Sequence, residues 1–360
     1  MKRLNVAIIG QGRSGRGIHG EYFLREEGKR FCVKAVVDKL EDRRKQAQET
    51  FHCDTYDDYQ KLYNRNDIDL VINATYSYLH YPITLDLLQH GFNVVVEKPF
   101  ARYVHECDDM IQAAKRNHVM LAVFQQSRFA PYYRKIREIV DSGALGRIIQ
   151  VSVNYSSFGR RWDWQCCQDY YGGSLLNTGP HPMDQVVDLL DYDGMPVVFS
   201  RLDRVNTFGD AEDYAKIIVT APERPLFDIE VSSCNNYAED IYKIQGSNGS
   251  LRASMKHCEW KYYKPEELQK QHLILNPLTD ENGKPGYCRE EIKWYENSWD
   301  AAEGHAFGSA VDTYYEHVYE HLINGVEFPV KNEKVKQQIA IAEVVHNQNP
   351  LSKFAEREAF

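Results

Sequence analysis

Two short clusters contain the side chains that proton and hydride transfer require. The first is Glu97-Lys98-Pro99, directly after the apolar run Val94–Val96. An ammonium at the carboxyl end of a buried strand can bind a substrate hydroxyl and stabilise an alkoxide. Because proline cannot continue a strand ladder, the chain turns at Pro99, and we expect a cis peptide bond before it. The alternative is a strand end that carries two solvated charges.

The second cluster runs from Gly172 to Asp184 and includes Asn177 and His181. Its paired glycines allow a close backbone approach, and its prolines suit the first turn of a helix. Asn177 and His181 are four residues apart, so they can share one helix face. A neutral imidazole can take a proton from a hydroxyl near neutral pH. A purely structural histidine at a helix start is the alternative.

A glycine-rich loop near the amino terminus predicts a nucleotide site. Gly10-Gln11-Gly12-Arg13-Ser14-Gly15 follows a short apolar strand and precedes a predicted helix, an arrangement that lets backbone amides meet a pyrophosphate. Asp38 ends the next predicted strand and suits the ribose 2′-hydroxyl of NAD. Use of NADP stays open because Lys39, Arg43 and Arg44 follow. Alternatively, Asp38 caps the helix that begins near Leu40.

The stretch Arg160–Gln165 combines aromatic rings with charges. Arg161, Trp162 and Trp164 suit a sugar, whose ring faces stack on aromatic side chains and whose hydroxyls need hydrogen-bonding partners. A surface loop with a buried tryptophan is the alternative.

The order of predicted elements indicates an α/β protein with two sheets. Strands alternate with helices over residues 1–124, which predicts a doubly wound parallel Rossmann domain. Residues 125–330 predict a second, α+β domain with a largely antiparallel sheet. Residues 255–305 are polar, and we interpret them as an insertion or a hairpin pair. Residues 331–360 form a last helix and a tail.

These separated motifs together resemble the glucose–fructose oxidoreductase / inositol dehydrogenase / MocA (Gfo/Idh/MocA) family. Ser127-Arg128-Phe129 and the segment Gly246–Leu251 strengthen the resemblance. It implies an NAD(P)-binding domain, a substrate and oligomerisation domain with an open sheet over residues 125–330, and an active site between the two domains. It also implies a homodimer or homotetramer formed through the open sheet face.

The resemblance also implies roles for single residues. Lys98 matches the active-site lysine and His181 the catalytic histidine, while Glu97 lies on the cofactor side. Two further matches concern the cofactor: Thr75 and His80 lie in the loop that approaches it, and Gln126 lies near the nicotinamide.

One position departs from the family pattern. Asn177 stands where the family often has aspartate, so it can hydrogen-bond a substrate hydroxyl but cannot hold an imidazolium by charge.

Composition excludes several other classes of protein. The 360 residues carry a net charge of −9 without a basic block, so we expect no nucleic-acid partner. No apolar run is long enough to span a bilayer, so we expect no membrane partner and a cytoplasmic location. The eight scattered cysteines predict free thiols. We expect no metal site, and interpret His317 and His321 as an exposed helix face.

These observations predict an NAD(P)-dependent dehydrogenase that acts on a secondary hydroxyl of a sugar, polyol or glycoside. In this hypothesis His181 takes the hydroxyl proton, Lys98 stabilises the oxyanion and Asn177 orients the substrate. Two alternatives remain: glycoside cleavage assisted by a recycled NAD, and a sensor that binds sugar and nucleotide without turnover. A short-chain dehydrogenase is excluded because no lysine has a tyrosine four residues before it.

Overall fold

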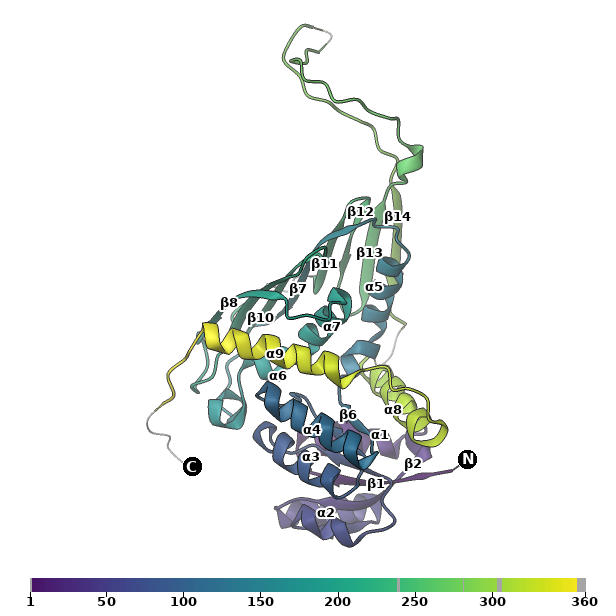
Figure 1. Cartoon of the computed structure of the whole chain (residues 1–360), viewed down its shortest axis with the longest axis vertical. Helices are drawn as coiled ribbons and strands as arrows, with labels where there is room; N and C mark the ends of the chain where they lie inside the picture. The colour runs from purple at the N-terminus through teal and green to yellow at the C-terminus, as the bar shows by residue number, and fades with distance from the viewer. Residues whose placement is uncertain (1, 238–239, 281, 303–305, 355–360) are drawn as a thin grey trace.

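The computed structural model consists of two sheets with their helices and a long arm (Figure 1). It describes residues 2–237, 240–280, 282–302 and 306–354. The amino-terminal sheet lies at the bottom of Figure 1, the second sheet lies above it, and the arm extends from the top of the second sheet.

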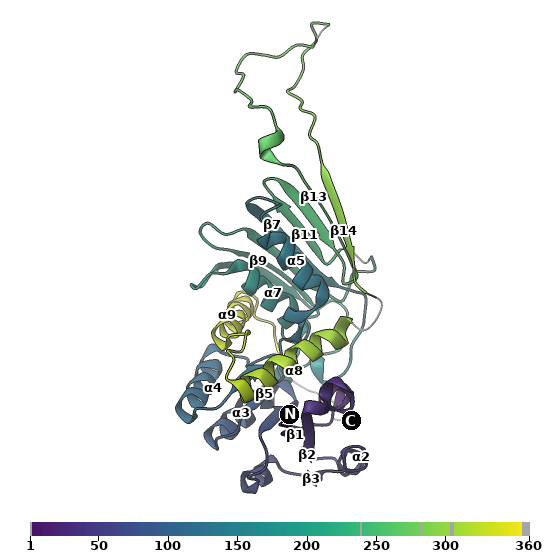
Figure 2. The same ribbon diagram turned by 90° about the vertical axis from the view of Figure 1, so that its right-hand side faces the viewer.

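The amino-terminal sheet has six parallel strands in the order β3-β2-β1-β4-β5-β6. Short runs of valine, isoleucine and leucine form its central strands, which helices bury on both sides (Figure 2). The order reverses beside β1, so the carboxyl ends of β1 and β4 flank a crevice in which such sheets bind ligands. The strands are β1 (Leu4–Ile9), β2 (Phe31–Val37), β3 (Asp54–Tyr56), β4 (Leu70–Asn73), β5 (Val94–Val96) and β6 (Leu121–Val123).

Helical segments join these strands. The glycine loop opens into a π-helical turn, Gly15–Gly20, and then into α1 (Glu21–Leu24). The longer helices are α2 (Glu41–Phe51), α3 (His80–Gln89) and α4 (Val104–Asn117). Shorter 3-10 segments are η2 (Glu27–Arg30), η3 (Tyr59–Asn64), η4 (Ser77–Leu79) and η5 (Gln126–Phe129).

The second sheet has eight strands in the order β14-β13-β12-β11-β7-β10-β9-β8. Neighbouring strands are antiparallel except β10 and β7, which are parallel. Helices α5 (Pro131–Asp141), α7 (Pro180–Leu190) and α9 (Asn332–Gln348) pack on one face. The strands are β7 (Ile148–Ser156), β8 (Val197–Asp203), β9 (Tyr214–Thr220), β10 (Leu226–Ser232), β11 (Tyr242–Gly246), β12 (Gly249–Ala253), β13 (His257–Tyr262) and β14 (Tyr295–Asp300).

The chain returns to the first domain near its end. Helix α8 (Ala306–Asn324) places Tyr314 and Tyr315 in the core of the amino-terminal sheet, together with Val335 and Ile339 of α9. Helix α9 therefore packs against both sheets, because Ile341 and Val345 lie in the second core.

The structure confirms the predicted α/β class and both sheets. The peptide bond between Lys98 and Pro99 is cis, as expected. Residues 255–305 contain the antiparallel pair β13 and β14, which agrees with a hairpin, while residues 303–305 of that stretch lie outside the described part. The short strand β3 was not predicted, because only three residues pair there.

A buried ion pair ties η5, the segment that follows β6, to α7. Arg128 of η5 donates to both carboxylate oxygens of Asp184, at 2.9 and 2.7 Å, and to Asp188 at 2.9 Å. Asp184 is 0% exposed, so its charge depends on this guanidinium. The pair fixes η5, which carries Gln126, against the helix that carries His181.

We predict that Arg128→Leu lowers the free energy of unfolding by about 3–5 kcal/mol, because it leaves a buried carboxylate without its partner. Arg134→Leu is the matched control: Arg134 is exposed, and its replacement should change stability by less than about 0.5 kcal/mol. Urea unfolding followed by circular dichroism measures both. Equal stabilities of the two variants would contradict the prediction.

Candidate active site

Lys98 lies between the two domains. Its Nζ donates to the backbone carbonyl of Asn177 at 2.7 Å, so the amine from the strand end β5 reaches the short helix α6 (Ser174–Asn177). Burial lowers the pKa of Lys98, and the nearby guanidinium groups of Arg13 and Arg161 lower it further, while Glu97 opposes them. The amine is therefore surrounded by residues from both domains.

A chain of buried polar groups supports Lys98 from behind. Glu97 Oε2 accepts the backbone N–H of Lys98 at 3.0 Å, and Oε1 lies 3.2 Å from Nε2 of His19. The other imidazole nitrogen of His19 lies 2.6 Å from the hydroxyl of Tyr315. Since a carboxylate only accepts, Nε2 of His19 carries the proton toward Glu97. Burial alone would raise the pKa of Glu97, but His19 and Lys98 lower it to about 2.

Sequence reasoning missed His19 and Tyr315. His19 lies four residues after the last loop glycine, and its position on the first turn beyond the loop was an available signal. Tyr315 lies in α8, more than 200 residues after Glu97, and no spacing in the sequence connects them.

His181 lies in the first turn of α7, and Lys98 acts on it electrostatically. Burial, and then the charge of Lys98, lower the pKa of His181 to about 3, so the imidazole is neutral at physiological pH. Its Nδ1 is buried and has no hydrogen-bond partner among the described residues. The structure thus brings Lys98, His181 and the backbone of Asn177 together.

The side chain of Asn177 points to a neighbouring loop. Its amide nitrogen lies 3.5 Å from Oε1 of Gln165, which also accepts from Arg161. Trp162 is 77% exposed and packs edge-on against Phe208, so the structure does not bring it to Lys98. Arg161 of the same loop lies close enough to Lys98 for its charge to lower the pKa of the lysine.

Trp164 joins an aromatic group that spans the two domains. Its ring lies 5.0 Å from that of Tyr76 and 6.3 Å from that of Tyr170. Tyr78 also contacts Tyr170, at 5.1 Å. Tyr76 and Tyr78 belong to the loop after β4, whereas Trp164 and Tyr170 follow β7. We call these four residues the aromatic bridge; the sequence did not reveal it, because its halves are far apart in the chain.

The glycine loop has the shape that a dinucleotide requires. A Cβ on Gly10, whose φ is +91°, would lie 2.5 Å from the carbonyl oxygen of Ala74, and one on Gly15 would lie 1.8 Å from that of Gly10. A Cβ on Gly12 would meet nothing within 4 Å, so this glycine borders open space. The loop therefore packs tightly on the protein side and stays open on the other, and its residues fit the cofactor.

Asp38 links the end of β2 to this loop. Its carboxylate accepts the backbone N–H groups of Gln11, at 2.8 Å, and Leu40, at 2.9 Å. Arg43 lies 3.5 Å from the same carboxylate. Asp38 thus orders the loop and the entry to α2, and its role toward a ribose stays a prediction.

The other residues predicted to bind the cofactor lie around the same strand ends. The Thr75 hydroxyl donates to the Asn73 side chain at 2.7 Å. His80 is buried, and its two nitrogens lie 2.8 and 3.3 Å from the carbonyl oxygens of Pro99 and Thr75. Its contacts are therefore those of a residue that holds the loop in place. Gln126 is buried, and its Oε1 has no hydrogen-bond partner among the described residues.

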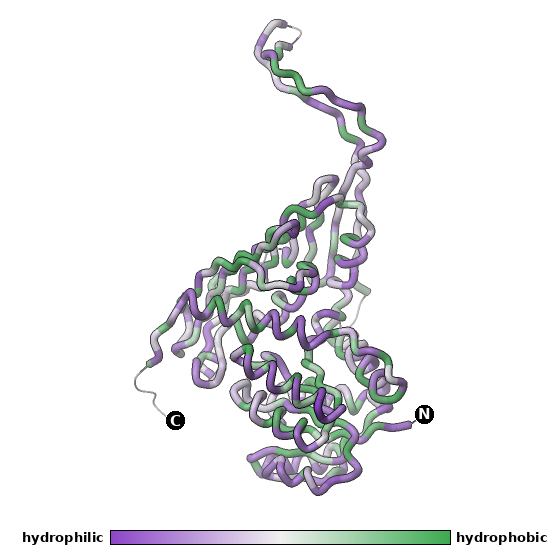
Figure 3. Tube along the Cα trace, viewed as in Figure 1, coloured by the Kyte–Doolittle hydropathy of each residue, from purple (hydrophilic) through white to green (hydrophobic). Residues whose placement is uncertain are grey.

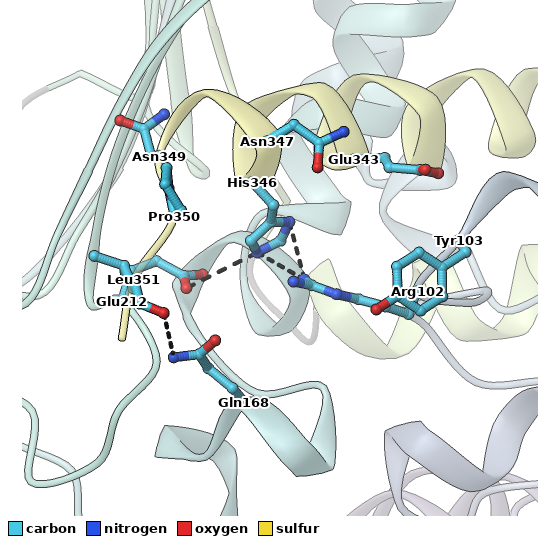
Figure 4. A pocket seen from close by; sticks show the side chains of 10 residues that line it. All are labelled: Arg102, Tyr103, Gln168, Glu212, Glu343, His346, Asn347, Asn349, Pro350 and Leu351. Atoms are coloured by element: carbon cyan, nitrogen blue, oxygen red, sulfur yellow. Dashed lines mark hydrogen bonds and ion pairs between the residues drawn. The ribbon is translucent and has the colours of Figure 1, made fainter. Parts of the chain in front are cut away.

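A separate cavity of about 230 Å³ lies between the residues that precede α4 and the carboxyl-terminal end of α9 (Figure 4). Arg102 contacts the ring of His346 at 2.7 Å, and Glu212 lies 4.0 Å from that ring. Burial raises the pKa of Glu212 to about 7. Glu212 Oε1 accepts the backbone N–H of Leu175 at 3.0 Å. This carboxyl therefore holds the amino-terminal end of α6, whereas Lys98 contacts its last residue. The residues that line the cavity include none of the predicted site residues.

Two models of one protein family match this chain, one in each domain. Residues 4–125 match the profile described as "Oxidoreductase family, NAD-binding Rossmann fold", and residues 133–252 match the GFO/IDH/MocA C-terminal domain. The chain belongs to the Gfo/Idh/MocA oxidoreductase family. Residues 4–125 are accordingly an NAD-binding Rossmann domain.

Named relatives in this family are moderately similar. The chain is 26% identical over 266 residues to 2,7-anhydro-N-acetylneuraminate hydratase of Mediterraneibacter gnavus, a match covering 72% of this chain and 69% of the relative. It is 27% identical over 270 residues to scyllo-inositol 2-dehydrogenase (NADP(+)) IolW of Bacillus subtilis, covering 70% and 73%.

Solved structures share the fold at lower identity. The WlbA dehydrogenase from Bordetella pertussis, solved with NADH and UDP-GlcNAcA, superposes with a TM-score of 0.75 at 18% identity and covers 96% of this chain and 95% of its own. GenD2 from gentamicin A biosynthesis, solved with NAD, gives a TM-score of 0.77 at 19% identity, covering 99% and 97%.

The described residues hold neither a membrane-spanning helix nor a cluster of metal ligands. None of their helices combines the length and the apolar character needed to cross a membrane. They also contain no group of three or more histidine, cysteine, aspartate or glutamate side chains arranged to hold a metal ion.

The glycine loop offers a matched pair of substitutions. We predict that Gly12→Ala leaves the unfolding temperature unchanged but weakens NADH binding at least tenfold, because its Cβ enters the open side of the loop. Gly15→Ala should instead lower the unfolding temperature, because its Cβ collides with the Gly10 carbonyl. Thermal unfolding and NADH fluorescence titration separate the two effects. Tight NADH binding by Gly12→Ala would contradict this placement of the cofactor.

Proposed function

We propose that this protein is an NAD(P)-dependent dehydrogenase that oxidises a secondary hydroxyl of a sugar, polyol or glycoside. The observation that carries the proposal is the convergence of Lys98 and His181, from separate domains, beside the NAD-binding strand ends. The bound nicotinamide supplies the hydride acceptor.

In this proposal His181 is the general base. The imidazole is neutral, so one of its two ring nitrogens keeps a lone pair that can receive the proton of a substrate hydroxyl. The charge of Lys98 disfavours the protonated form of His181. Once the substrate is oxidised, the imidazolium therefore tends to release its proton to solvent.

Lys98 stabilises the oxygen that becomes negative as its proton leaves. Its Nζ has three donors and uses one on the Asn177 carbonyl, so donors remain for a substrate oxygen. The ionised Glu97 behind it favours the charged ammonium against the burial that disfavours it. We assign Asn177 to the orientation of the substrate, with Arg161 and Trp164 at the sugar side of the site.

We infer the preferred nucleotide from the residues at the end of β2, and the substrate class from the relatives. The Asp38 carboxylate at the end of β2 favours NAD, and the adjacent Arg43 leaves NADP as a weaker second cofactor. A carbohydrate substrate agrees with the relatives, which include an inositol dehydrogenase and a sialic-acid hydratase. We expect the protein to act in the cytoplasm.

We also propose a homodimer or homotetramer formed through the open face of the second sheet. The helices α5, α7 and α9 cover the other face. Lys216 on the open face pairs with Asp228 at 2.7 Å and Glu230 at 3.4 Å, which neutralises part of the charge that a second copy would meet.

A second candidate is a redox-neutral reaction in which oxidation only activates the substrate for elimination or hydration and the cofactor is then restored. The relationship to a hydratase favours it. Both candidates use the same two residues, so the discriminating quantity is the net formation of reduced nicotinamide.

Single substitutions at the two residues test the function directly. We predict that Lys98→Ala and His181→Ala each lower kcat by about 10²–10⁴-fold on the best substrate found in a screen of sugars, polyols and glycosides. Binding of NADH should remain within about threefold of wild type, because the glycine loop is untouched. Turnover is measured by product chromatography and by absorbance of the reduced nicotinamide. Product without a change in absorbance supports the redox-neutral candidate, and wild-type turnover by either variant excludes both candidates.

The pKa of His181 gives a prediction about pH. A base with a pKa of about 3 stays unprotonated as the pH falls through 6.5, so kcat/KM should be flat from pH 8 to pH 5. An ordinary histidine would lose activity as the pH fell below about 6.5. A pH profile of initial rates in buffers of constant ionic strength measures this. An acidic limb near 6.5 would show that burial does not keep this base neutral.

A further inference from the structure

A long arm joins β13 and β14 and extends far beyond the second sheet (Figures 1 and 2). It comprises residues 263–294, and none of its described residues is buried. About 15 residues in each leg, at roughly 3.3 Å per residue, allow it to reach on the order of 50 Å. A small domain is about 30 Å across, so the arm is long enough to cross a neighbouring molecule.

The arm carries large apolar side chains into solvent. Leu273, Ile274 and Leu275 are consecutive and are 87%, 53% and 86% exposed, and Tyr287 on the returning leg is 92% exposed. Figure 3 shows such apolar stretches along an otherwise polar arm. Burying an exposed leucine is worth about 1.5–3 kcal/mol, so a surface that covers these residues gains substantially.

The backbone of the arm is also largely unpaired. In its described part, hydrogen bonds between the backbones of the two legs occur at the tip, where Asp280 donates to Lys284 and Gly286 donates to Leu278. Further from the tip, side chains join the legs: Gln271 donates to Glu290 at 3.1 Å, Lys293 pairs with Glu267 at 3.2 Å, and the rings of Tyr263 and Trp294 lie 5.9 Å apart at the base. Fixing an extended chain costs about 1–2 kcal/mol per residue, and the arm's own contacts do not offset that cost.

We propose that the arm packs on a second copy of this chain and clasps the oligomer. The arm continues the edge pair β13–β14, so its base adjoins the open face through which we propose that the copies associate. In a two-fold dimer each copy would both extend an arm and receive one, which doubles the buried surface.

The charge of the arm agrees with an apolar protein partner. Residues 263–294 contain five lysine or arginine and six aspartate or glutamate residues, so their net charge is −1. This near-neutral balance offers no electrostatic attraction for nucleic acid or for an anionic membrane. The inference rests on the proposed association through the open sheet face and holds whichever reaction the active site performs.

Cys288 allows a direct test with the full-length protein. It lies on the returning leg and is exposed, while the other seven cysteines are half-buried or buried. A benzophenone maleimide on Cys288 should, on irradiation, cross-link two chains and give a product of twice the chain mass. Cys288→Ser treated in the same way is the control and should give none. Cross-links confined to one chain would overturn the proposal.

A second measurement removes the apolar contact without touching either core. Leu273→Asp combined with Leu275→Asp should weaken self-association at least tenfold in sedimentation velocity, while the unfolding temperature of the separated chains stays unchanged. Gln271→Asp, which adds one of the same charges beside the apolar stretch, should self-associate nearly as well as wild type. Self-association of the double variant at wild-type strength, or a wild-type protein that stays monomeric, would overturn the proposal.

Discussion

The hydrogen bond from the Lys98 ammonium to the Asn177 carbonyl is the contact on which the site depends. It joins the end of a parallel strand in one domain to a four-residue helix in the other, and each side has its own buried support. Glu97, His19 and Tyr315 fix the lysine side. The Glu212 carboxyl fixes the helix side through the N–H of Leu175. The geometry between amine and imidazole is therefore set by groups that do not themselves touch the reacting oxygen.

Burial affects the two proposed catalytic groups, His181 and Lys98, in different ways. The same exclusion of water that favours an uncharged imidazole at His181 also disfavours the ammonium of Lys98. An ionised Glu97 next to the lysine compensates, and it can do so because His19 donates to it. Neighbouring groups thus adopt different protonation states at one pH, an arrangement typical of acid–base catalysis.

Local patterns sufficed to predict much of this architecture. The glycine loop, the strand that ends at Glu97 and the prolines that open α7 each leave a signature within about ten residues. Contacts between distant segments leave no such local signature in the sequence. The contact of His19 with Tyr315, the aromatic bridge, and the hydrogen bond of Glu212 to α6 all depend on how the domains dock. The placement of Trp162 shows the converse, since a loop rich in aromatic residues directs only some of its rings toward the site. Likewise, the polarity of residues 255–305 indicated an insertion or a hairpin pair but not an extended arm.

The aromatic bridge has a consequence for how the nucleotide is exchanged. Tyr76 and Tyr78 belong to the loop that follows Thr75, so the loop that we expect to approach the cofactor is held by rings of the other domain. Loosening that loop means separating several ring contacts at once, and each such pair contributes about 0.5–1.5 kcal/mol. If the dinucleotide lies against this loop, we expect its departure to require the two domains to separate. Long residence of the coenzyme through many turnovers is the kinetic behaviour that this construction favours.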